Sequence, residues 1–297
     1  MDTSTSTFTE YAQQLRGRVD AALRGYCELP EGCPSELREA IEYSLLGPGK
    51  RLRPMLVLMA SEACGGTIRA ALPAACAGEM VHAYSLVHDD LPAMDDDDLR
   101  RGRPTCHKKY GEALAILTGD ALLALAFEVL AKDTRPPETA ARCCAMLAEA
   151  AGACRLVGGQ ADDLAGRLAR GGIDDLETIH HRKTGALLVV SLRLGAAVAG
   201  AGATQSAALE AFGGKLGLAF QITDDLLDVR GEEGEVGKRL GKDAHRGTLT
   251  FPGLLGIEES QRRAERLIHE ACEALRPLGA GAGNLDALAR YVLERNR

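Results

Sequence analysis

The length, composition and charge of the chain narrow the possible classes of protein. It has 297 residues, 4% of them aromatic and none of them tryptophan, and alanine and leucine dominate, which predicts a single all-α domain over residues 1–297. The net charge of -7, with no recurring basic face, argues against nucleic acid as a partner, and nine cysteines without a CxxC spacing argue against a disulfide framework.

The N-terminal part of the chain predicts two helices. Residues 1–10 contain neither a basic nor an apolar segment, so we expect no signal or transit peptide and a cytoplasmic location. Residues 8–24 place apolar side chains at helical spacing, as in an amphipathic surface helix. After a break at 30–34, Ser35 is expected to cap a second helix, which ends at the turn 47–49.

Three cations follow that turn within four residues, namely Lys50, Arg51 and Arg53. A short basic loop beside glycines is more often solvated than functional when it is considered alone. It becomes a candidate anion site if a neighbouring part of the chain also predicts a bound anion.

Residues 82–105 carry the strongest signal in the chain. Six aspartates lie within ten residues, at positions 89, 90 and 95–98. Like charges so close repel one another by roughly 1 kcal/mol even in bulk water unless cations lie between them. The apolar residues before them put Asp89 and Asp90 at the C-terminal end of a buried helix, where the helix dipole disfavours negative charge. The stretch is therefore either a metal site or a solvated acidic loop.

The sign of the charge changes directly after these aspartates, at Arg100, Arg101 and Arg103. Hard oxygen ligands followed by guanidinium groups suit a phosphate ester held through magnesium, because magnesium keeps part of its water and shares its other ligands between one or two carboxylates and substrate phosphates. The pattern therefore favours a site for magnesium and a phosphate ester over a calcium site.

The middle of the chain predicts packing helices at 112–132 and 137–153. Residues 185–203 are apolar enough to imitate a membrane span. Arg193 within them would cost about 2.5 to 3.5 kcal/mol in a bilayer, so we expect a buried bundle helix and no membrane span. The adjacent histidines at 180–181 point about 100° apart on a helix and cannot share one metal ion.

A second acidic segment, FQITDDLLD at 220–228, lies in another apolar helix. Asp224 and Asp228 share one face of that helix, with Gln221 about one turn before Asp224, while Asp225 points about 100° away. A basic loop follows this segment, as one follows the first. Two such helices predict one site, in which two carboxylate walls hold magnesium and a diphosphate between them.

These segments resemble those of one family. DDLPAMD at 89–95 is similar to the first aspartate-rich motif of the trans-isoprenyl diphosphate synthases, and FQITDDLLD is similar to the second. The likeness runs from GKRLRP at 49–54 to the C-terminus and is closest to the bacterial farnesyl diphosphate synthases. It implies an isoprenoid-synthase-type helical bundle around a deep central cavity, a homodimer, and prenyl transfer from dimethylallyl or geranyl diphosphate to isopentenyl diphosphate, with farnesyl diphosphate as the product.

The resemblance also implies roles for individual residues. Isopentenyl diphosphate would be bound by Lys50, Arg53, His82 and Arg101. The allylic diphosphate would be bound by Arg100, Lys183 and Lys238. The dipoles that stabilise the allylic cation would come from Lys183, Thr184 and Gln221. Magnesium ions, expected to be three per active site, would be held by the aspartates of both motifs, Asp89, Asp90, Asp95, Asp224, Asp225 and Asp228. The segment 158–163, with Asp163, is expected to support the site without a catalytic role.

The charged, glycine-rich segment after the second motif is expected to form a mobile lid. It departs from the family, because Thr248 stands where relatives usually carry a lysine. One cationic contact to the allylic diphosphate is therefore expected to be missing, or to be supplied by Lys242 or Arg246.

Tyr84 and Ser85, about one turn before Asp89, are expected to form the floor of the cavity. The bulky Tyr84 favours farnesyl over longer products. A geranylgeranyl diphosphate synthase would share every other residue, so it stays the first alternative. A terpene cyclase would not need Lys50, Arg53 and His82. A metal-dependent phosphohydrolase built on His88 and Asp89, or a catalytically silent partner subunit, are the alternatives from other classes.

Overall fold

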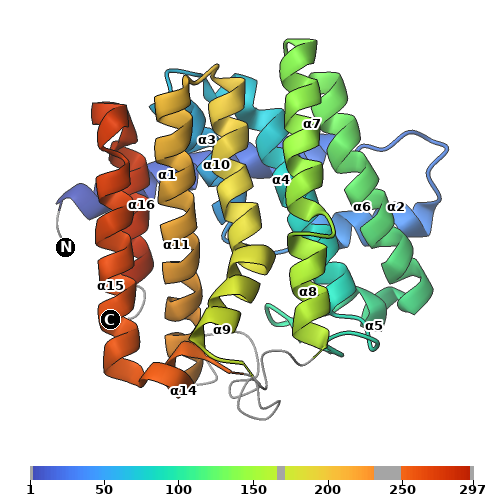
Figure 1. Cartoon of the computed structure of the whole chain (residues 1–297). Coiled ribbons are helices and arrows are strands. Elements are labelled where there is room, and N and C mark those ends of the chain that lie inside the picture. The colour runs from blue at the N-terminus through green and yellow to red at the C-terminus, as the bar shows by residue number, and fades with distance from the viewer. Residues whose placement is uncertain (1–2, 166–170, 231–248, 295–297) are drawn as a thin grey trace.

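The computed structural model describes residues 3–165, 171–230 and 249–294, and over these residues the chain is almost entirely helical (Figure 1). The first part of the chain forms α1 (Thr3–Tyr26), α2 (Ser35–Leu45), α3 (Leu52–Ala63), α4 (Ile68–Asp89), α5 (Cys106–Tyr110), α6 (Glu112–Asp133) and α7 (Pro137–Ala151). The second part forms α8 (Leu156–Leu164), α9 (Ile173–His180), the π-helix η2 (His181–Gly185), α10 (Ala186–Val198), α11 (Ala203–Arg230), α14 (Phe251–Leu255), α15 (Ile257–Ala274), the 3₁₀-helix η3 (Arg276–Ala282) and α16 (Gly283–Glu294). The predicted all-α fold is confirmed.

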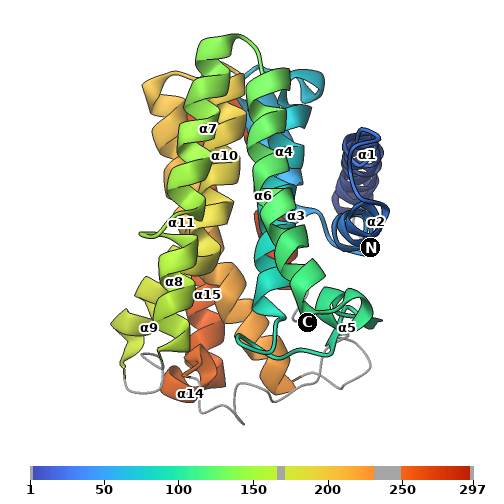
Figure 2. The same ribbon diagram turned by 90° about the vertical axis from the view of Figure 1, so that its right-hand side faces the viewer.

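The core is built around α4, which packs against α3, α6 and α10. Its buried residues lie on all sides of the helix, as in Ala75, Met80 and Val81, which is the pattern of a helix enclosed by others. In Figure 2, α1 and α2 lie outside the bundle, on the side away from α10 and α11. The largest cluster of buried apolar residues takes side chains from both ends of the chain, including α1, α3, α4, α10, α11 and α16.

The two acidic segments lie at the same end of the bundle. Asp89 is the last residue of α4, and Asp224 lies near the C-terminal end of α11. Both helices run towards the end that is drawn at the bottom of Figures 1 and 2. On α11, buried Leu216, Ala219 and Ile222 follow at spacings of three residues and hold one face of the helix in the bundle. The fold therefore brings together two segments that are far apart in the sequence.

A short hairpin after the first motif was not anticipated. Strands β1 (Leu99–Arg100) and β2 (Arg103–Pro104) pair in antiparallel register, with Arg100 opposite Arg103. The connecting residues Arg101 and Gly102 have φ values of 53° and 73°, which is typical of a two-residue hairpin turn. The turn sends the side chains of Arg100 and Arg101 to different parts of the site.

The expected helix cap at Ser35 was wrong. Pro34 is the N-cap of α2, Ser35 is already its first helical residue, and no side chain caps this helix. Pro34 can take this place because its carbonyl accepts from the N–H of Arg38 at 3.0 Å, and because the cap residue needs no N–H of its own.

The apolar segment at 185–203 forms α10, in which Leu187, Leu192 and Leu194 are buried, as expected for a bundle helix. In the part of the chain that the structure describes, the one helix long and apolar enough to cross a membrane is α6. Its best window has a mean hydropathy of 2.0, and 44% of that window is buried in the bundle. A single helix of this kind is weak support for a membrane span, because core helices of soluble proteins share these properties.

Candidate active site

The first acidic motif folds back onto the end of α4. The N–H of Asp95 donates to the carbonyl of Asp89 at 2.8 Å, and the N–H of Asp97 donates to the carbonyl of Asp90 at 3.2 Å. The last carbonyls of a helix have no partner within the helix, and this loop supplies them. As a result, Asp95 lies beside Asp89 although five residues separate them.

The aspartates of this run have different partners. Asp90 is buried and accepts from Nε of Arg100 at 2.7 Å and from Nη2 of Arg100 at 2.6 Å. Asp97 lies 3.9 Å from the same guanidinium, and Asp98 forms an ion pair with Lys108 at 2.6 Å. The switch from acidic to basic residues in the sequence therefore corresponds to ion pairs between nearby residues of this segment. In this structure Asp90 holds Arg100 in place.

Asp89 is costly to ionise where it stands. Its pKa is raised to about 6, mainly by burial; the charges of Asp95 and Asp90 contribute to the rise, while Lys183 and Arg100 oppose it. A strongly perturbed carboxylate beside a second one is typical of a functional site, and a bound cation would favour the charged form of both.

Lys183 and Thr184 lie in the π-helix η2, an element that is frequent at functional sites. Nζ of Lys183 donates to Oδ2 of Asp163 on α8 at 2.8 Å. Burial lowers the pKa of Lys183, but the carboxylates of Asp163, Asp89 and Asp95 outweigh it and leave the pKa raised. Lys183 is therefore a charged group between α8 and the first motif.

Two supporting residues explain how α8 meets η2. A side chain at Gly159 would come within 2.8 Å of the backbone nitrogen of Lys183, so glycine allows the two elements to approach each other. Asp163, which the sequence placed in a supporting segment, is the direct partner of Lys183. In the sequence, the occurrence of the glycine and the aspartate together in the segment 158–163 was the feature that could have indicated this contact with Lys183.

The second motif contributes groups with different surroundings. Asp225 is buried, and its Oδ2 accepts from the backbone N–H of Phe251 at 2.9 Å, which fixes the start of α14. The side chains of Gln221, Asp224 and Asp228 are partly exposed. Asp225 therefore helps to fix the start of α14, whereas Gln221, Asp224 and Asp228 are partly exposed to solvent.

Arg53 on α3 links this motif to the basic loop. The pKa of Arg53 is lowered to about 10, mainly by burial; the carboxylates of Glu79 and Asp224 oppose that shift, and Arg101 adds to it. Its Nε is buried and has no hydrogen-bond partner among the residues that the structure describes. A partly buried guanidinium with an unused donor is well suited to an anionic ligand.

His82 belongs to the same cluster of cations. Its pKa lies well below the usual range because it is buried and because Arg53, Arg101, Arg100 and Arg51 surround it, so its imidazole is neutral. With Arg100 and Arg101 it lines a hollow of about 70 Å³. Lys50 lines a different hollow of about 270 Å³, between α1 and α16. The structure therefore brings His82, Arg53 and Arg101 together, whereas the side chain of Lys50 lines a different hollow from His82 and Arg101.

The predicted floor residues lie on α4 above the motif. Tyr84 is buried, and its ring meets the ring of His88 edge to face, with centroids 5.8 Å apart. Nε2 of His88 is 3.0 Å from the carbonyl of Ile116 on α6. The hydroxyl of Ser85 donates to the carbonyl of His82 at 2.9 Å. Because His88 is occupied with α6, the phosphohydrolase hypothesis loses its proposed histidine.

The carboxylates of the two acidic motifs fit magnesium better than a metal ion whose ligands must all come from protein side chains. Among residues 3–165, 171–230 and 249–294, no three His, Cys, Asp or Glu side chains lie close enough together to hold a metal ion. Magnesium typically binds through one or two carboxylates and completes its shell with water and substrate phosphates. Asp89 with Asp95, and Asp224, are carboxylates of this kind. Lys238, Lys242, Arg246 and Thr248 lie outside the described residues.

The sequence pattern of the family described as polyprenyl synthetase matches residues 34–277. The chain belongs to the polyprenyl synthetase family. It is therefore a prenyltransferase, and the predicted resemblance is confirmed.

Its relatives in the polyprenyl synthetase family carry different product names. The chain is 48% identical over 297 residues to chloroplastic geranylgeranyl pyrophosphate synthase from Catharanthus roseus, with 99% of this chain and 83% of that protein covered. It is 42% identical over 290 residues to farnesyl diphosphate synthase from Geobacillus stearothermophilus, with 97% of each covered. The apo structure of an FPP/GFPP synthase from Zymomonas mobilis matches with a TM-score of 0.87 at 36% identity, covering 97% of this chain and 99% of that one.

His180, in one wall of the site, should make the stability of this polyprenyl synthetase depend on pH. His180 stacks on Phe251, with ring centroids 5.7 Å apart, and burial lowers its pKa from 6.5 to about 4. The unfolded chain therefore takes up a proton before the folded protein does. The stabilising contribution of the neutral ring is complete above pH 6.5 and is lost as the pH falls towards about 4.

We expect His180→Phe, which keeps a ring against Phe251, to make this acid-induced loss shallower. The free energy of unfolding in urea, measured from pH 6.5 to about 4 in both proteins, provides the check. Parallel curves for the two proteins would show that His180 does not titrate in the way its burial implies.

Proposed function

We propose that this polyprenyl synthetase is a farnesyl diphosphate synthase, which condenses isopentenyl diphosphate with dimethylallyl and then geranyl diphosphate. One observation carries the proposal. Lys183 lies near the carboxylates of Asp89 and Asp95, whereas Arg53 lies near Arg101 and the neutral His82. Such a site offers separate places for a metal-bound diphosphate and a metal-free one.

The allylic diphosphate would lie between the two acidic motifs. Lys183 and Arg100 would neutralise part of its charge, and Asp163 and Asp90 hold these two side chains in place. Lys238 would add a further cation from the segment after α11. Magnesium, held by Asp89, Asp95 and Asp224, would neutralise charge on the diphosphate as it leaves.

Isopentenyl diphosphate would bind without metal, through Lys50, Arg53, His82 and Arg101. Cleavage of the C–O bond of the allylic substrate would release diphosphate and leave an allylic cation, which the carbonyl, hydroxyl and amide dipoles of Lys183, Thr184 and Gln221 would stabilise. Dipoles of this kind act most strongly in a site closed to water. The double bond of isopentenyl diphosphate then attacks the cation, and the released diphosphate accepts the last proton. Asp90, Asp225 and Asp228 would support the metal site, the first two through Arg100 and Phe251.

The choice of farnesyl diphosphate rests on Tyr84. Its buried ring is braced by His88, and His88 fits against Gly119, where any side chain would come within 2.0 Å of Nε2 of His88. A floor built in this way would stop a growing chain early. Geranylgeranyl diphosphate synthase is the second candidate, because the relative from Catharanthus roseus carries that name.

The proposal is tested by incubating the purified protein with magnesium, isopentenyl diphosphate and each allylic diphosphate in turn, and by measuring the length of the products. Farnesyl diphosphate as the main product is expected from both dimethylallyl and geranyl diphosphate. Geranylgeranyl diphosphate as the main product would favour the second candidate. A cyclic terpene, or no condensation at all, would contradict the proposed function.

We also propose that the whole chain is one domain and that it forms a homodimer through α6. Ile116 and Leu117 on this helix are 45% and 53% exposed although α6 is the most apolar long helix described. Exposed apolar faces of this kind mark interaction sites. We expect light scattering to give the mass of a dimer, and Leu117→Asp to shift it to a monomer. A monomeric unaltered protein would contradict this part of the proposal. The cytoplasmic location stays a prediction.

A further inference from the structure

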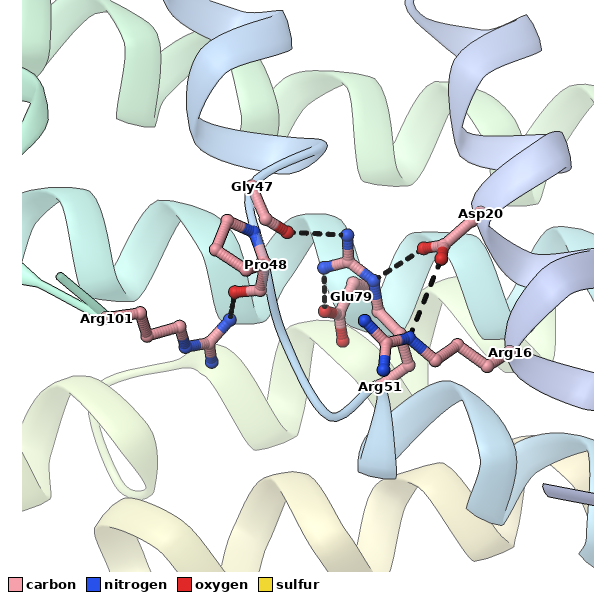
Figure 3. Close-up of polar contacts among 7 residues, drawn as sticks. All are labelled: Arg16, Asp20, Gly47, Pro48, Arg51, Glu79 and Arg101. Carbon is pink, nitrogen blue, oxygen red and sulfur yellow. Dashed lines mark hydrogen bonds and ion pairs between the residues drawn. The ribbon is translucent and has the colours of Figure 1, made fainter. Parts of the chain in front are cut away.

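Arg51, which has no assigned role in the proposed reaction, connects three segments of the chain (Figure 3). Its Nε donates to Asp20 on α1 at 2.8 Å, and its Nη1 donates to Glu79 on α4 at 2.8 Å. Its Nη2 donates to the carbonyl of Gly47 at 2.9 Å. Arg51 is 6% exposed and Glu79 is 3% exposed, so most of this network is shielded from water. Every nitrogen of the guanidinium has a protein partner.

The backbone of Arg51 is as unusual as its side chain. Arg51 is the N-cap of α3 and has φ 52° and ψ 33°, a left-handed conformation that side-chain-bearing residues rarely adopt. Strained backbone of this kind persists when the surrounding contacts determine it, and it clusters at functional sites. The three hydrogen bonds of the side chain supply those contacts. This conformation sets the directions in which the chain leaves towards Lys50 on one side and Arg53 on the other.

The network also reaches the other cations of the candidate site. Glu79 lies three residues before His82, so the two side chains are neighbours on one face of α4. Arg101 donates through Nη1 to the carbonyl of Pro48 at 2.5 Å, in the loop that Arg51 holds through Gly47. A side chain at Gly49 would come within 2.3 Å of Nη1 of Arg101, so this loop also provides the surface on which Arg101 rests.

We propose that Arg51, held by Asp20 and Glu79, is a positioning residue that sets Lys50, Arg53 and Arg101 for the diphosphate of isopentenyl diphosphate. The inference rests on the proposed function, since that function identifies the ligand. Arg51 does not bind the ligand itself, because its nitrogens are already bonded to Asp20, Glu79 and Gly47. It acts through the loop at 47–50, which carries Lys50, leads into α3 with Arg53, and provides the surface on which Arg101 rests.

For the variant Asp20→Asn, net charge alone predicts tighter binding of the anion, whereas our proposal predicts weaker binding. Asp20 lies on the opposite side of Arg51 from Arg101 and is partly exposed (Figure 3). If only net charge mattered, Asp20→Asn would remove a negative charge and strengthen the binding of an anion. If Asp20 acts by holding Arg51, the same change loosens the loop and weakens binding. The sign of the effect therefore separates the two explanations.

The experiment compares Asp20→Asn and Arg51→Lys with the unaltered enzyme. Lysine keeps the charge of Arg51 but cannot make three directed hydrogen bonds in a plane. Arg193→Lys is the matched control, because Arg193 forms an ion pair with Glu149 that joins α10 and α7 away from the site. KM for each substrate, kcat and the melting temperature are measured for all four proteins.

We expect Arg51→Lys to raise KM for isopentenyl diphosphate by about 10-fold or more, the usual size of effect when a group that orients a ligand-binding side chain is changed. Asp20→Asn should raise it in the same direction by a smaller factor. KM for the allylic diphosphate and kcat at saturation should change by less than about twofold, and Arg193→Lys should change neither KM. An unchanged or lowered KM for isopentenyl diphosphate in Asp20→Asn, or equal changes in both KM values, would overturn the proposal.

Calorimetric titration of the metal-free proteins with isopentenyl diphosphate separates this inference from the proposed function. The dissociation constant should rise in Arg51→Lys and Asp20→Asn as KM does. If the unaltered protein binds isopentenyl diphosphate but forms no condensation product, the proposed function fails while the titration still tests the role of Arg51. Equal dissociation constants in all four proteins would rule that role out. The partly exposed Asp20 keeps the test usable if Arg51→Lys does not fold.

Discussion

Asp89→Ala and Asp224→Ala should each lower turnover by several powers of ten and leave the fold intact. Each tenfold loss corresponds to about 1.4 kcal/mol of activation free energy. Asp89 and Asp95 would hold magnesium on one side of the allylic diphosphate and Asp224 on the other, so either change removes charge neutralisation that the reaction needs. Stability should not suffer at Asp89, because burial and the neighbouring carboxylates already raise its pKa and make its ionised form unfavourable in the free protein.

Turnover at saturating magnesium and substrate is the measurement, with far-UV circular dichroism and the melting temperature as checks of folding. Glu210→Ala is a suitable control, because Glu210 is an exposed carboxylate on the same helix as Asp224. It should keep normal turnover. If both aspartate variants turn over at near-normal rates, the assignment of the two acidic motifs to one metal site is wrong.

Tyr84→Ala should shift the main product from farnesyl to geranylgeranyl diphosphate or longer chains. The chain is expected to grow along α4 from the motif towards Tyr84, and each added isoprene unit is about as long as one helical turn. Removing the ring opens that path. If Tyr84 served only to pack the core, the change would lower stability, by about 3 to 5 kcal/mol as for other large buried aromatics, without altering the product.

Product lengths and the free energy of unfolding, measured on the same preparations, distinguish these two roles. Tyr84→Phe keeps the ring and should keep farnesyl diphosphate as the product. Tyr26→Ala removes a tyrosine that joins α1 to α6 through Asp133, so it is the control for losing a tyrosine ring at another place in the fold. An unchanged product in Tyr84→Ala would place the floor on other residues and remove the basis for choosing farnesyl over geranylgeranyl diphosphate.

Features that depend on neighbours in the sequence could be predicted well. The helix at 112–132 follows from apolar spacing, and the structure has it as α6 with a C-terminal end one residue later; the apolar helix around the second motif is α11. The end of α4 at Asp89 follows from the acidic run after an apolar segment. Ser35 shows the limit of such rules, because a serine before a helix is a common cap and here Pro34 takes that place.

Partners from distant parts of the chain could not be predicted in this way. Lys183 pairs with Asp163, Asp225 receives the N–H of Phe251, and Arg51 joins Asp20 to Glu79. Each contact depends on how whole helices pack, and no local spacing encodes it. Arg51 in particular looks like one of three similar cations in the sequence, and the hydrogen bonds from all three of its guanidinium nitrogens to distant protein groups distinguish it in the structure.

The sequence by itself determined the all-α class, the family and the two acidic motifs, because helical periodicity and runs of charge are local properties of the chain. The tertiary structure alone decided the partners of each aspartate, as Asp89 and Asp90 show. These adjacent residues have the same chemistry. Their surroundings differ because the packing at the end of α4 brings Asp95 and Lys183 close to Asp89, whereas Arg100 binds Asp90.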